Sequence, residues 1–245
     1  MENIIELDNI HFSDHEGREI VQGVSINYKP GKTTAIIGPS GGGKSTVLKL
    51  SAGLLQPSRG AVFYKGQNVA LMNRSENLEF RREGAFVFQD SALWANMDLF
   101  QILELPLKIH YPKMDKQQRK ERIDSITSEV GYKKSLLVRP STLSMGEQKL
   151  IAYARAMLCN PSLLFLDEWT ESMDETSAER LVNLVKKKQS QGATILFVSH
   201  DMRIIKDLSD FVIVISDGKV VMNSPKDHIM GNLSLNDFIK MGIES

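Results

Sequence analysis

Short apolar segments alternate with longer helical ones along most of the chain. The continuous apolar segments are rich in branched residues and comprise residues 34–37, 85–88, 163–166, 194–198 and 211–215. Runs of this length and composition are typical of strands that are buried on both faces of a parallel sheet. Because helical periods lie between them, we predict an α/β fold.

Three further segments near the N-terminus also favour strands. They are residues 4–10, 20–26 and 61–64, and Lys65-Gly66 closes the last of them as a turn. We predict an antiparallel β element in this part of the chain, beside the parallel core.

The strand signal fades in residues 90–158. Asp115 and Gln118 have the spacing of a capping box, which predicts that a helix begins there. A second helix follows Ser144. We interpret the segment as a helical subdomain inserted into one domain of residues 1–245, whose α/β core comprises residues 1–89 and 159–245.

Charge and hydropathy narrow the classes of partner. The chain has 30 Lys and Arg against 30 Asp and Glu, so its net charge gives no sign of a nucleic-acid partner, and we expect none. No run of about 18 apolar residues could span a bilayer. The first residues lack the basic start and apolar core of a signal peptide. We expect a cytoplasmic protein that reaches a membrane only through a partner.

A glycine-rich segment has the P-loop pattern G-x-x-x-x-G-K-S between an apolar strand and a helical period. Its glycines let backbone N–H groups surround phosphate oxygens, and the helix N-terminus attracts the same anion. We expect Lys44 to reach the β- and γ-phosphates and the Ser45 hydroxyl to bind Mg²⁺. A glycine-rich turn that binds nothing is disfavoured by this Lys-Ser pair. The predicted phosphate-binding residues are Gly38, Pro39, Ser40, Gly41, Gly42, Gly43, Lys44, Ser45 and Thr46.

Two acids follow the apolar segment 163–166. At the carboxyl end of a parallel strand, acids point into the crevice where ligands bind. We expect Asp167 to hold Mg²⁺ and Glu168 to polarise the attacking water as general base. An acidic pair alone is equally typical of a helix start, and the P-loop upstream is what favours the catalytic interpretation.

A second helix start has the sequence Leu-Ser-Met-Gly-Glu-Gln from Leu143 to Gln148. Ser144 and Glu147 have capping-box spacing, which alone indicates a well-capped helix. Ser144 lies 23 residues before Asp167. With this spacing the sequence resembles the ABC transporter ATPases, whose L-S-G-G-Q signature precedes a strand-end Asp-Glu pair.

The resemblance covers nearly the whole chain and implies a P-loop NTPase with a RecA-like parallel-sheet core, an antiparallel β element and a helical subdomain. Residues 38–46 match the Walker A motif, and residues 163–167 match Walker B. Gln89 matches the Q-loop glutamine, Asp174 lies in the D-loop match, and His200 matches the switch histidine.

The family implies a mechanism in which two copies pack head to tail around ATP. The signature helix of one copy covers the γ-phosphate in the P-loop of the other, which adds Ser144, Gly146 and Asp174 to the nucleotide-binding residues. Closure then moves the attached membrane subunits. The implied catalytic residues are Glu168, His200, Gln89 and Lys44, and the implied metal ligands are Ser45, Gln89 and Asp167.

The resemblance also implies partners and a substrate. The region from Gln89 to Met97 would contact integral-membrane permease subunits at the cytoplasmic face of the inner membrane. Residues 90–110 resemble the corresponding stretch of Mla-type ATPases, which implies phospholipid trafficking between bacterial membranes and a periplasmic lipid-shuttling protein reached through the permease. The alternative is the ATPase of another ABC transporter, with a different small-molecule or lipoprotein substrate.

Three residues depart from the family pattern. Met145 replaces the first signature glycine, Glu147 replaces the signature glutamine, and Trp169 replaces the proline after the catalytic glutamate. Met145 and Trp169 favour, as a further alternative, a slow scaffold gated by nucleotide. A soluble cassette acting on ribosomes or DNA is disfavoured, because such proteins carry two cassettes or long coiled coils. No residue is assigned to adenine.

Overall fold

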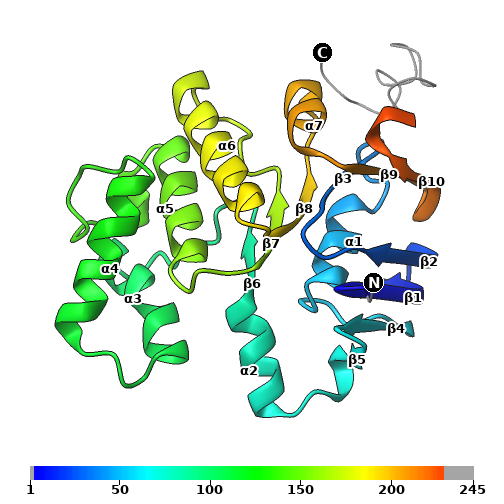
Figure 1. Cartoon of the computed structure of the whole chain (residues 1–245), viewed down its shortest axis with the longest axis horizontal. Helices are drawn as coiled ribbons and strands as arrows, with labels where there is room; N and C mark the ends of the chain where they lie inside the picture. Colours follow the sequence, from blue (N-terminus) through cyan, green and yellow to red (C-terminus); the bar gives the residue numbers. More distant parts are fainter. Residues whose placement is uncertain (1–2, 229–245) are drawn as a thin grey trace.

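The computed structural model describes residues 3–228, in which two β-sheets and their covering helices form the molecule (Figure 1). The larger sheet has the strand order β10-β9-β3-β8-β7-β6, and the smaller has the order β2-β1-β4-β5. The strands are β1 Ile5–Ser13, β2 Glu19–Tyr28, β3 Thr33–Ile37, β4 Arg59–Tyr64, β5 Gln67–Asn68, β6 Gly84–Val87, β7 Leu163–Asp167, β8 Thr194–Val198, β9 Phe211–Ser216 and β10 Lys219–Pro225. The helices are α1 Lys44–Ser51, α2 Arg74–Glu83, α3 Leu99–His110, α4 Lys116–Glu129, α5 Met145–Met157, α6 Glu175–Ser190 and α7 Met202–Leu208, with short 3₁₀ turns at Val69–Leu71 and Pro140–Thr142.

The larger sheet is the parallel core that the sequence predicts. Strands β9, β3, β8, β7 and β6 run parallel, and every residue of β3, β7 and β8 is buried. Side chains alternate between the two faces, so Ala35 and Ile37 belong to one hydrophobic cluster and Ile36 to the other. Burial on both faces explains why these strands are continuous apolar runs in the sequence.

The predicted antiparallel element is also present. β1 pairs antiparallel with β2 and with β4, and the resulting sheet packs over α1. Edge strand β10, which pairs antiparallel with β9, was not predicted from the sequence. Its residues alternate between exposed and half-buried, so it lacks the continuous apolar run of the core strands.

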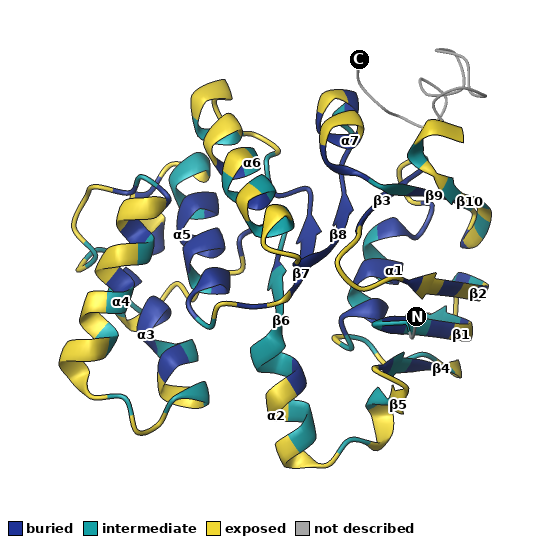
Figure 2. Ribbon diagram, viewed as in Figure 1, coloured by how far each residue is buried: buried dark blue, intermediate teal, exposed yellow. Residues whose placement is uncertain are grey.

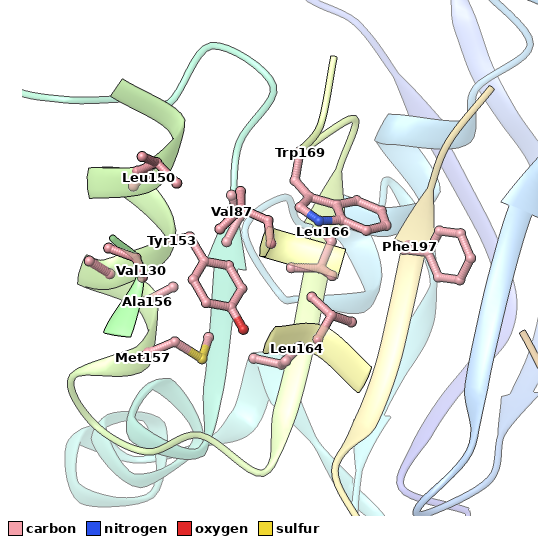
Figure 3. Packing of buried hydrophobic residues seen from close by; sticks show 14 of the residues in the cluster. Val87, Val130, Leu150, Tyr153, Ala156, Met157, Leu164, Leu166, Trp169 and Phe197 are labelled. Carbon is pink, nitrogen blue, oxygen red and sulfur yellow. The ribbon is translucent and has the colours of Figure 1, made fainter. Parts of the chain in front are cut away.

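Helices α3, α4 and α5 connect β6 to β7 and lie at that end of the larger sheet (Figure 1). Their outer faces are exposed and their inner faces buried (Figure 2). In Figure 3, Leu150, Tyr153 and Met157 of α5 point toward Leu164 and the neighbouring strand residues. The predicted capping box of Asp115 and Gln118 begins α4. Within residues 3–228, no helix has both the length and the apolar character that a bilayer crossing requires.

A close backbone approach determines how the chain leaves β3. Gly38 has φ +143°, and a Cβ atom there would lie 1.9 Å from the carbonyl oxygen of Ile215 in β9. Only glycine fits this position, because any side chain would separate two neighbouring strands. The loop that follows β3 is therefore held against the end of β9.

We predict that Gly38→Ala lowers the free energy of unfolding of the nucleotide-free protein by about 3 kcal/mol, because the strands must separate. Gly41→Ala is the matched control: Gly41 also has positive φ, but a Cβ atom there would meet nothing within 4 Å. This control should cost about 1 kcal/mol, for the left-handed backbone alone. Urea denaturation measures both, and equal losses would contradict the steric explanation.

Candidate nucleotide site

The P-loop lies between the end of β3 and the start of α1. Gly43 is the N-cap of α1 with φ +99°, no side chain caps the helix, and no acidic residue occupies its first turn. The first N–H groups of this helix are thus left for an anion, and an anion is stabilised by the helix dipole. The loop therefore fits a phosphate group.

Lys44 lies across this loop. Its side chain is buried, and its Nζ donates hydrogen bonds to the carbonyl oxygens of Gly38 and Pro39, both at 2.9 Å. Burial lowers the pKa of Lys44, although the carboxylates of Glu168 and Asp167 act in the opposite direction. The ammonium group is thus held beside the predicted phosphate cradle by two backbone carbonyl groups.

The residues that the sequence assigns to Mg²⁺ come from three separate segments of the chain. The Ser45 hydroxyl at the start of α1 donates a hydrogen bond of 2.7 Å to Oδ1 of Asp167 at the end of β7. These are hard oxygen donors of the kind that Mg²⁺ prefers, so this pair fits the ion. Gln89, which follows β6, is exposed and donates from Nε2 to Oε2 of Glu171 at 2.8 Å.

Glu168 and His200 are brought together by the pairing of β7 with β8. The N–H of Glu168 donates to the carbonyl of Val198 at 3.1 Å, and the carboxylate Oε1 lies 2.9 Å from Nε2 of His200. Glu168 has φ +45°, an uncommon conformation for a residue with a side chain. Its carbonyl accepts the N–H of Glu171 at 3.2 Å, which closes a turn. The adjacent carboxyl ends of two strands thus place a carboxylate against an imidazole.

Burial perturbs both acids of the site. It raises the pKa of Asp167, while the hydrogen bond from Ser45 and nearby lysines act to lower it. Burial also raises the pKa of Glu168, opposed by His200 and reinforced by Glu171 and Asp167. Acids and a lysine with perturbed pKa values in one crevice are characteristic of functional sites.

Trp169 is fully buried beneath the turn that begins at Glu168. Its ring packs edge-on against Phe197 of β8 at a centroid distance of 5.4 Å (Figure 3). The indole is therefore an anchor that fixes the start of this turn in the core. The sequence identified Trp169 as a departure from the family pattern but did not predict which way it points.

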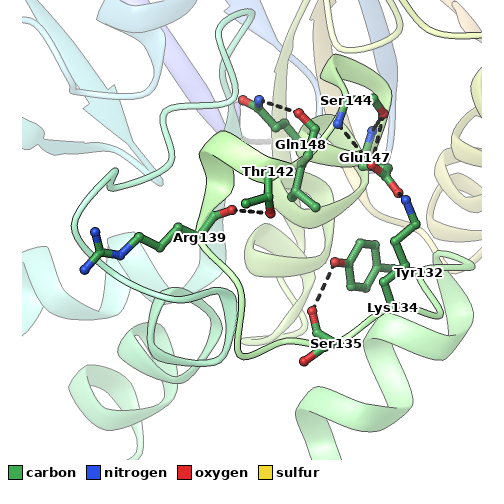
Figure 4. A network of polar contacts seen from close by, with 9 residues as sticks. Tyr132, Lys134, Ser135, Arg139, Thr142, Ser144, Glu147 and Gln148 are labelled. Carbon is green, nitrogen blue, oxygen red and sulfur yellow. Dashed lines mark hydrogen bonds and ion pairs between the residues drawn. The ribbon is translucent and has the colours of Figure 1, made fainter.

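The signature helix α5 has the capping box that Ser144 and Glu147 predict (Figure 4). Ser144 Oγ accepts the N–H of Glu147 at 3.3 Å, and Oε2 of Glu147 accepts the N–H of Ser144 at 3.0 Å. Oε1 of Glu147 also forms an ion pair of 2.6 Å with Lys134. Met145 is 60% exposed, so its side chain projects from the helix start into solvent.

The signature and D-loop matches are neighbours in space. A Cβ atom added at Gly146 would lie 3.9 Å from Oδ2 of Asp174, the N-cap of α6. Asp174 accepts the N–H of Ser177 at 2.9 Å and thereby begins that helix. Ser144, Gly146 and Asp174 are thus grouped around two adjacent helix starts.

The structure adds one residue that sequence reasoning missed. Lys149 of α5 is 2% exposed, and its Nζ donates a hydrogen bond of 2.7 Å to the carbonyl oxygen of Glu168. The sequence carries a signal for it, because Lys149, Ala152, Tyr153 and Ala156 have the 0, 3, 4, 7 spacing of one helix face and all are buried. A lysine on an apolar stripe indicates a buried charge with a partner.

The sequence assigns no residue to adenine, and Asp14 lies in the turn between β1 and β2. Its carboxylate accepts the backbone N–H groups of Glu16 and Arg18 in the β1–β2 turn. Phe12 of β1 packs against the hydrophobic cluster that the antiparallel sheet contributes to.

We predict that Asp167→Asn stabilises the nucleotide-free protein at pH 7.5. The folded-state pKa of Asp167 is raised, so keeping this carboxylate ionised costs stability above that pKa. The gain should shrink as pH falls and vanish below about pH 4, where the carboxyl is protonated in the folded and unfolded states alike. Urea denaturation across this range tests it, and a gain that persists at acid pH would contradict it.

Comparisons with known proteins agree with this geometry. Residues 21–171 match the family described as ABC transporter. The nickel import ATP-binding protein NikE of Shigella flexneri serotype 5b is 34% identical over 210 residues, which cover 84% of this chain and 78% of NikE. YejF of Escherichia coli K12, an uncharacterized ABC transporter ATP-binding protein, is 34% identical over the same share of this chain and 40% of its own length. The bacterial ABC cassette MJ0796, in a dimeric structure with ADP and Pi, superposes with a TM-score of 0.82 at 28% identity, covering 90% of this chain and 98% of MJ0796. The chain therefore belongs to the ABC transporter family, as an ATP-binding cassette that hydrolyses ATP.

Proposed function

We propose that this chain powers the import of a small solute as the ATPase subunit of an ABC transporter, peripheral to the cytoplasmic face of the inner membrane. The observation that carries the proposal is the contact of Glu168 with His200, 2.9 Å apart, beside the Ser45–Asp167 hydrogen bond. At one end of the parallel sheet, this arrangement would supply a base, the partner that orients it and two oxygens able to bind a metal ion.

In this proposal residues 38–46 and the N-terminus of α1 hold the triphosphate. Lys44 exchanges the carbonyl oxygens of Gly38 and Pro39 for phosphate oxygens, so its ammonium group keeps partners in both states. Ser45, Asp167 and Gln89 would hold Mg²⁺, which supplies positive charge to the β- and γ-phosphates.

Glu168 accepts a proton from the attacking water. A raised pKa suits this role, because a carboxylate in water is too weak a base and burial moves its pKa toward the working pH. His200 fixes the orientation of the carboxylate and, in the proposed mechanism, also holds the γ-phosphate. Gln89, already bonded to Glu171 of the same turn, relays the state of the site to the surface after β6.

The site is completed by a second copy in head-to-tail orientation. Ser144 and Gly146 at the start of α5, together with Asp174, would cover the nucleotide held by the other copy. The grouping of Gly146 beside Asp174 and the exposure of Met145 support this pairing, as does the dimeric form of the MJ0796 cassette.

A groove next to the segment that follows β6, where Gln89 lies, supports a membrane subunit as partner. About 570 Å³ in volume, it is lined chiefly by apolar side chains and includes Trp94, which is 45% exposed. Trp94 lies within the region from Gln89 to Met97 that we assign to the permease. Apolar exposure of this kind is typical of surfaces that another protein covers.

The relatives favour a small solute over a phospholipid. NikE is named for nickel import, and neither NikE nor YejF is named for lipid transport. The phospholipid hypothesis, with its periplasmic lipid-shuttling partner, is supported by the resemblance of residues 90–110 and is the second candidate. Different substrates are compatible with one cassette, since the membrane subunits select the substrate.

We predict that Glu168→Gln lowers kcat for ATP hydrolysis by roughly 100-fold or more while ATP binding persists, because the general base is lost and the phosphate cradle is intact. Lys44→Ala should instead weaken ATP binding. Single-turnover hydrolysis and equilibrium binding of a fluorescent ATP analogue measure the two effects. Equal turnover by the parent and Glu168→Gln would favour the slow-scaffold alternative.

We predict that the chain co-purifies from detergent-solubilised membranes with an integral-membrane permease. Mass spectrometry of the purified complex identifies that permease. A permease whose operon or complex includes a solute-binding protein supports the import proposal, whereas one joined to a lipid-shuttling protein supports the second candidate. Recovery with ribosomes and no membrane protein would contradict both.

A further inference from the structure

The proposed mechanism gives no role to the buried charge of Lys149. Lys149 in α5 is 2% exposed, and its Nζ lies 2.7 Å from the carbonyl oxygen of Glu168. Removing an ammonium group from water is costly unless it is paired, so a lysine buried this completely is held by specific partners.

The partner of Lys149 is the backbone of the proposed general base. The carbonyl of Glu168 accepts two donors, the N–H of Glu171 at 3.2 Å and the ammonium group of Lys149. Glu168 has φ +45°, a conformation that persists in a residue with a side chain only when its surroundings enforce it. A charged donor forms the stronger of such hydrogen bonds. Lys149 is therefore positioned to stabilise the turn that aims the Glu168 carboxylate at His200.

Besides its hydrogen bond, the positive charge of Lys149 also stabilises the turn that begins at Glu168. Its ammonium group is attracted by the carboxylates of Glu171, Glu168, Asp167 and Asp90. The turn begins at the adjacent buried carboxylates of Asp167 and Glu168, whose mutual repulsion would destabilise it, and the charge of Lys149 offsets this repulsion. A neutral residue of similar length would fill the space without supplying this charge.

The location of Lys149 connects two functional regions of one chain. Lys149 follows Ser144 and Gly146 in α5 by about one helical turn, and Ser144 and Gly146 would face the nucleotide of the second copy. A helix is rigid over this length, so a movement of its N-terminus is transmitted to the ammonium group. The hydrogen bond to Glu168 then carries the movement to the chain's own site.

We propose that Lys149 is a positioning residue for ATP hydrolysis, which fixes the turn bearing Glu168 and couples it to the helix that covers the second copy's nucleotide. This inference rests on the proposed roles of Glu168 and of the head-to-tail pair. It assigns the coupling between two nucleotide sites to a single hydrogen bond within each chain.

Three variants test the proposal in the full chain. Lys149→Met removes the charge and the donor but keeps the length of the side chain. Lys149→Arg restores both. Leu150→Ala is the packing control, because Leu150 is the neighbouring buried residue of α5 and has no polar group.

For Lys149→Met we expect kcat for ATP to fall about 10-fold or more while KM stays within about twofold, since residues 38–46 are untouched. Lys149→Arg should recover most of the lost kcat. In the nucleotide-free proteins, amide hydrogen exchange in the turn 168–171 should become faster in Lys149→Met and stay unchanged in Leu150→Ala.

A Lys149→Met protein with kcat within about twofold of the parent and unchanged exchange in turn 168–171 would overturn the proposal. So would equal losses in Lys149→Met and Leu150→Ala without recovery in Lys149→Arg, because that pattern indicates packing alone. If Lys149→Met does not fold, Lys149→Gln replaces it, with a loss of kcat expected for the missing charge. Failure of the proposed function gives a different result: Glu168→Gln would then hydrolyse ATP as fast as the parent.

Discussion

Charge buried at the carboxyl ends of β7 and β8 is the constraint on which the rest of this structure depends. Asp167 and Glu168 are almost completely enclosed, and so are Lys44 and Lys149. Each group costs free energy to remove from water, and each is stable there only because the others and their hydrogen bonds are held at short range. The five parallel strands supply the rigid frame that keeps these groups in place. Two residues hold the adjoining loops against this frame. Gly38 lets the P-loop lie against the end of β9, and the indole of Trp169 anchors the turn after Glu168 against Phe197.

The parts of the fold that the sequence predicts are those in which burial leaves a simple pattern. Core strands β3, β7 and β8 are buried at every residue, so each is a continuous apolar run. Helix α2 was missed because Phe80 is its only buried residue within a polar segment. Helix α3 was missed because its apolar residues are nearly continuous and Pro106 interrupts them. Both helices begin with a capping box, at Asn73 and Asp98, which was the available signal.

The nucleotide site could be predicted further than the substrate for a physical reason. Phosphate and magnesium demand backbone amides, a lysine, a hydroxyl and carboxylates in a fixed order, and residues 38–46 with Asp167 and Glu168 supply them. In the proposed transporter the membrane subunits select the solute, so the chemistry of the solute would leave no pattern in this chain. Lys149 could be predicted in part. Its place on a buried helix face can be read from the sequence, but its hydrogen bond to the Glu168 carbonyl depends on two segments that meet only in the folded chain.

The two tryptophans of the chain occupy opposite kinds of environment. Trp169 is fully enclosed beneath the turn that carries Glu168, whereas Trp94 is 45% exposed at the groove assigned to the membrane subunit. Indole emission shifts to the blue when water is excluded, so the two side chains are intrinsic optical reporters of different events. A blue shift from Trp94 would follow docking of the permease, and a change in Trp169 would follow rearrangement of the hydrolytic turn. The intrinsic fluorescence of the two tryptophans can thus report on the groove and on the turn at Glu168 without any attached dye.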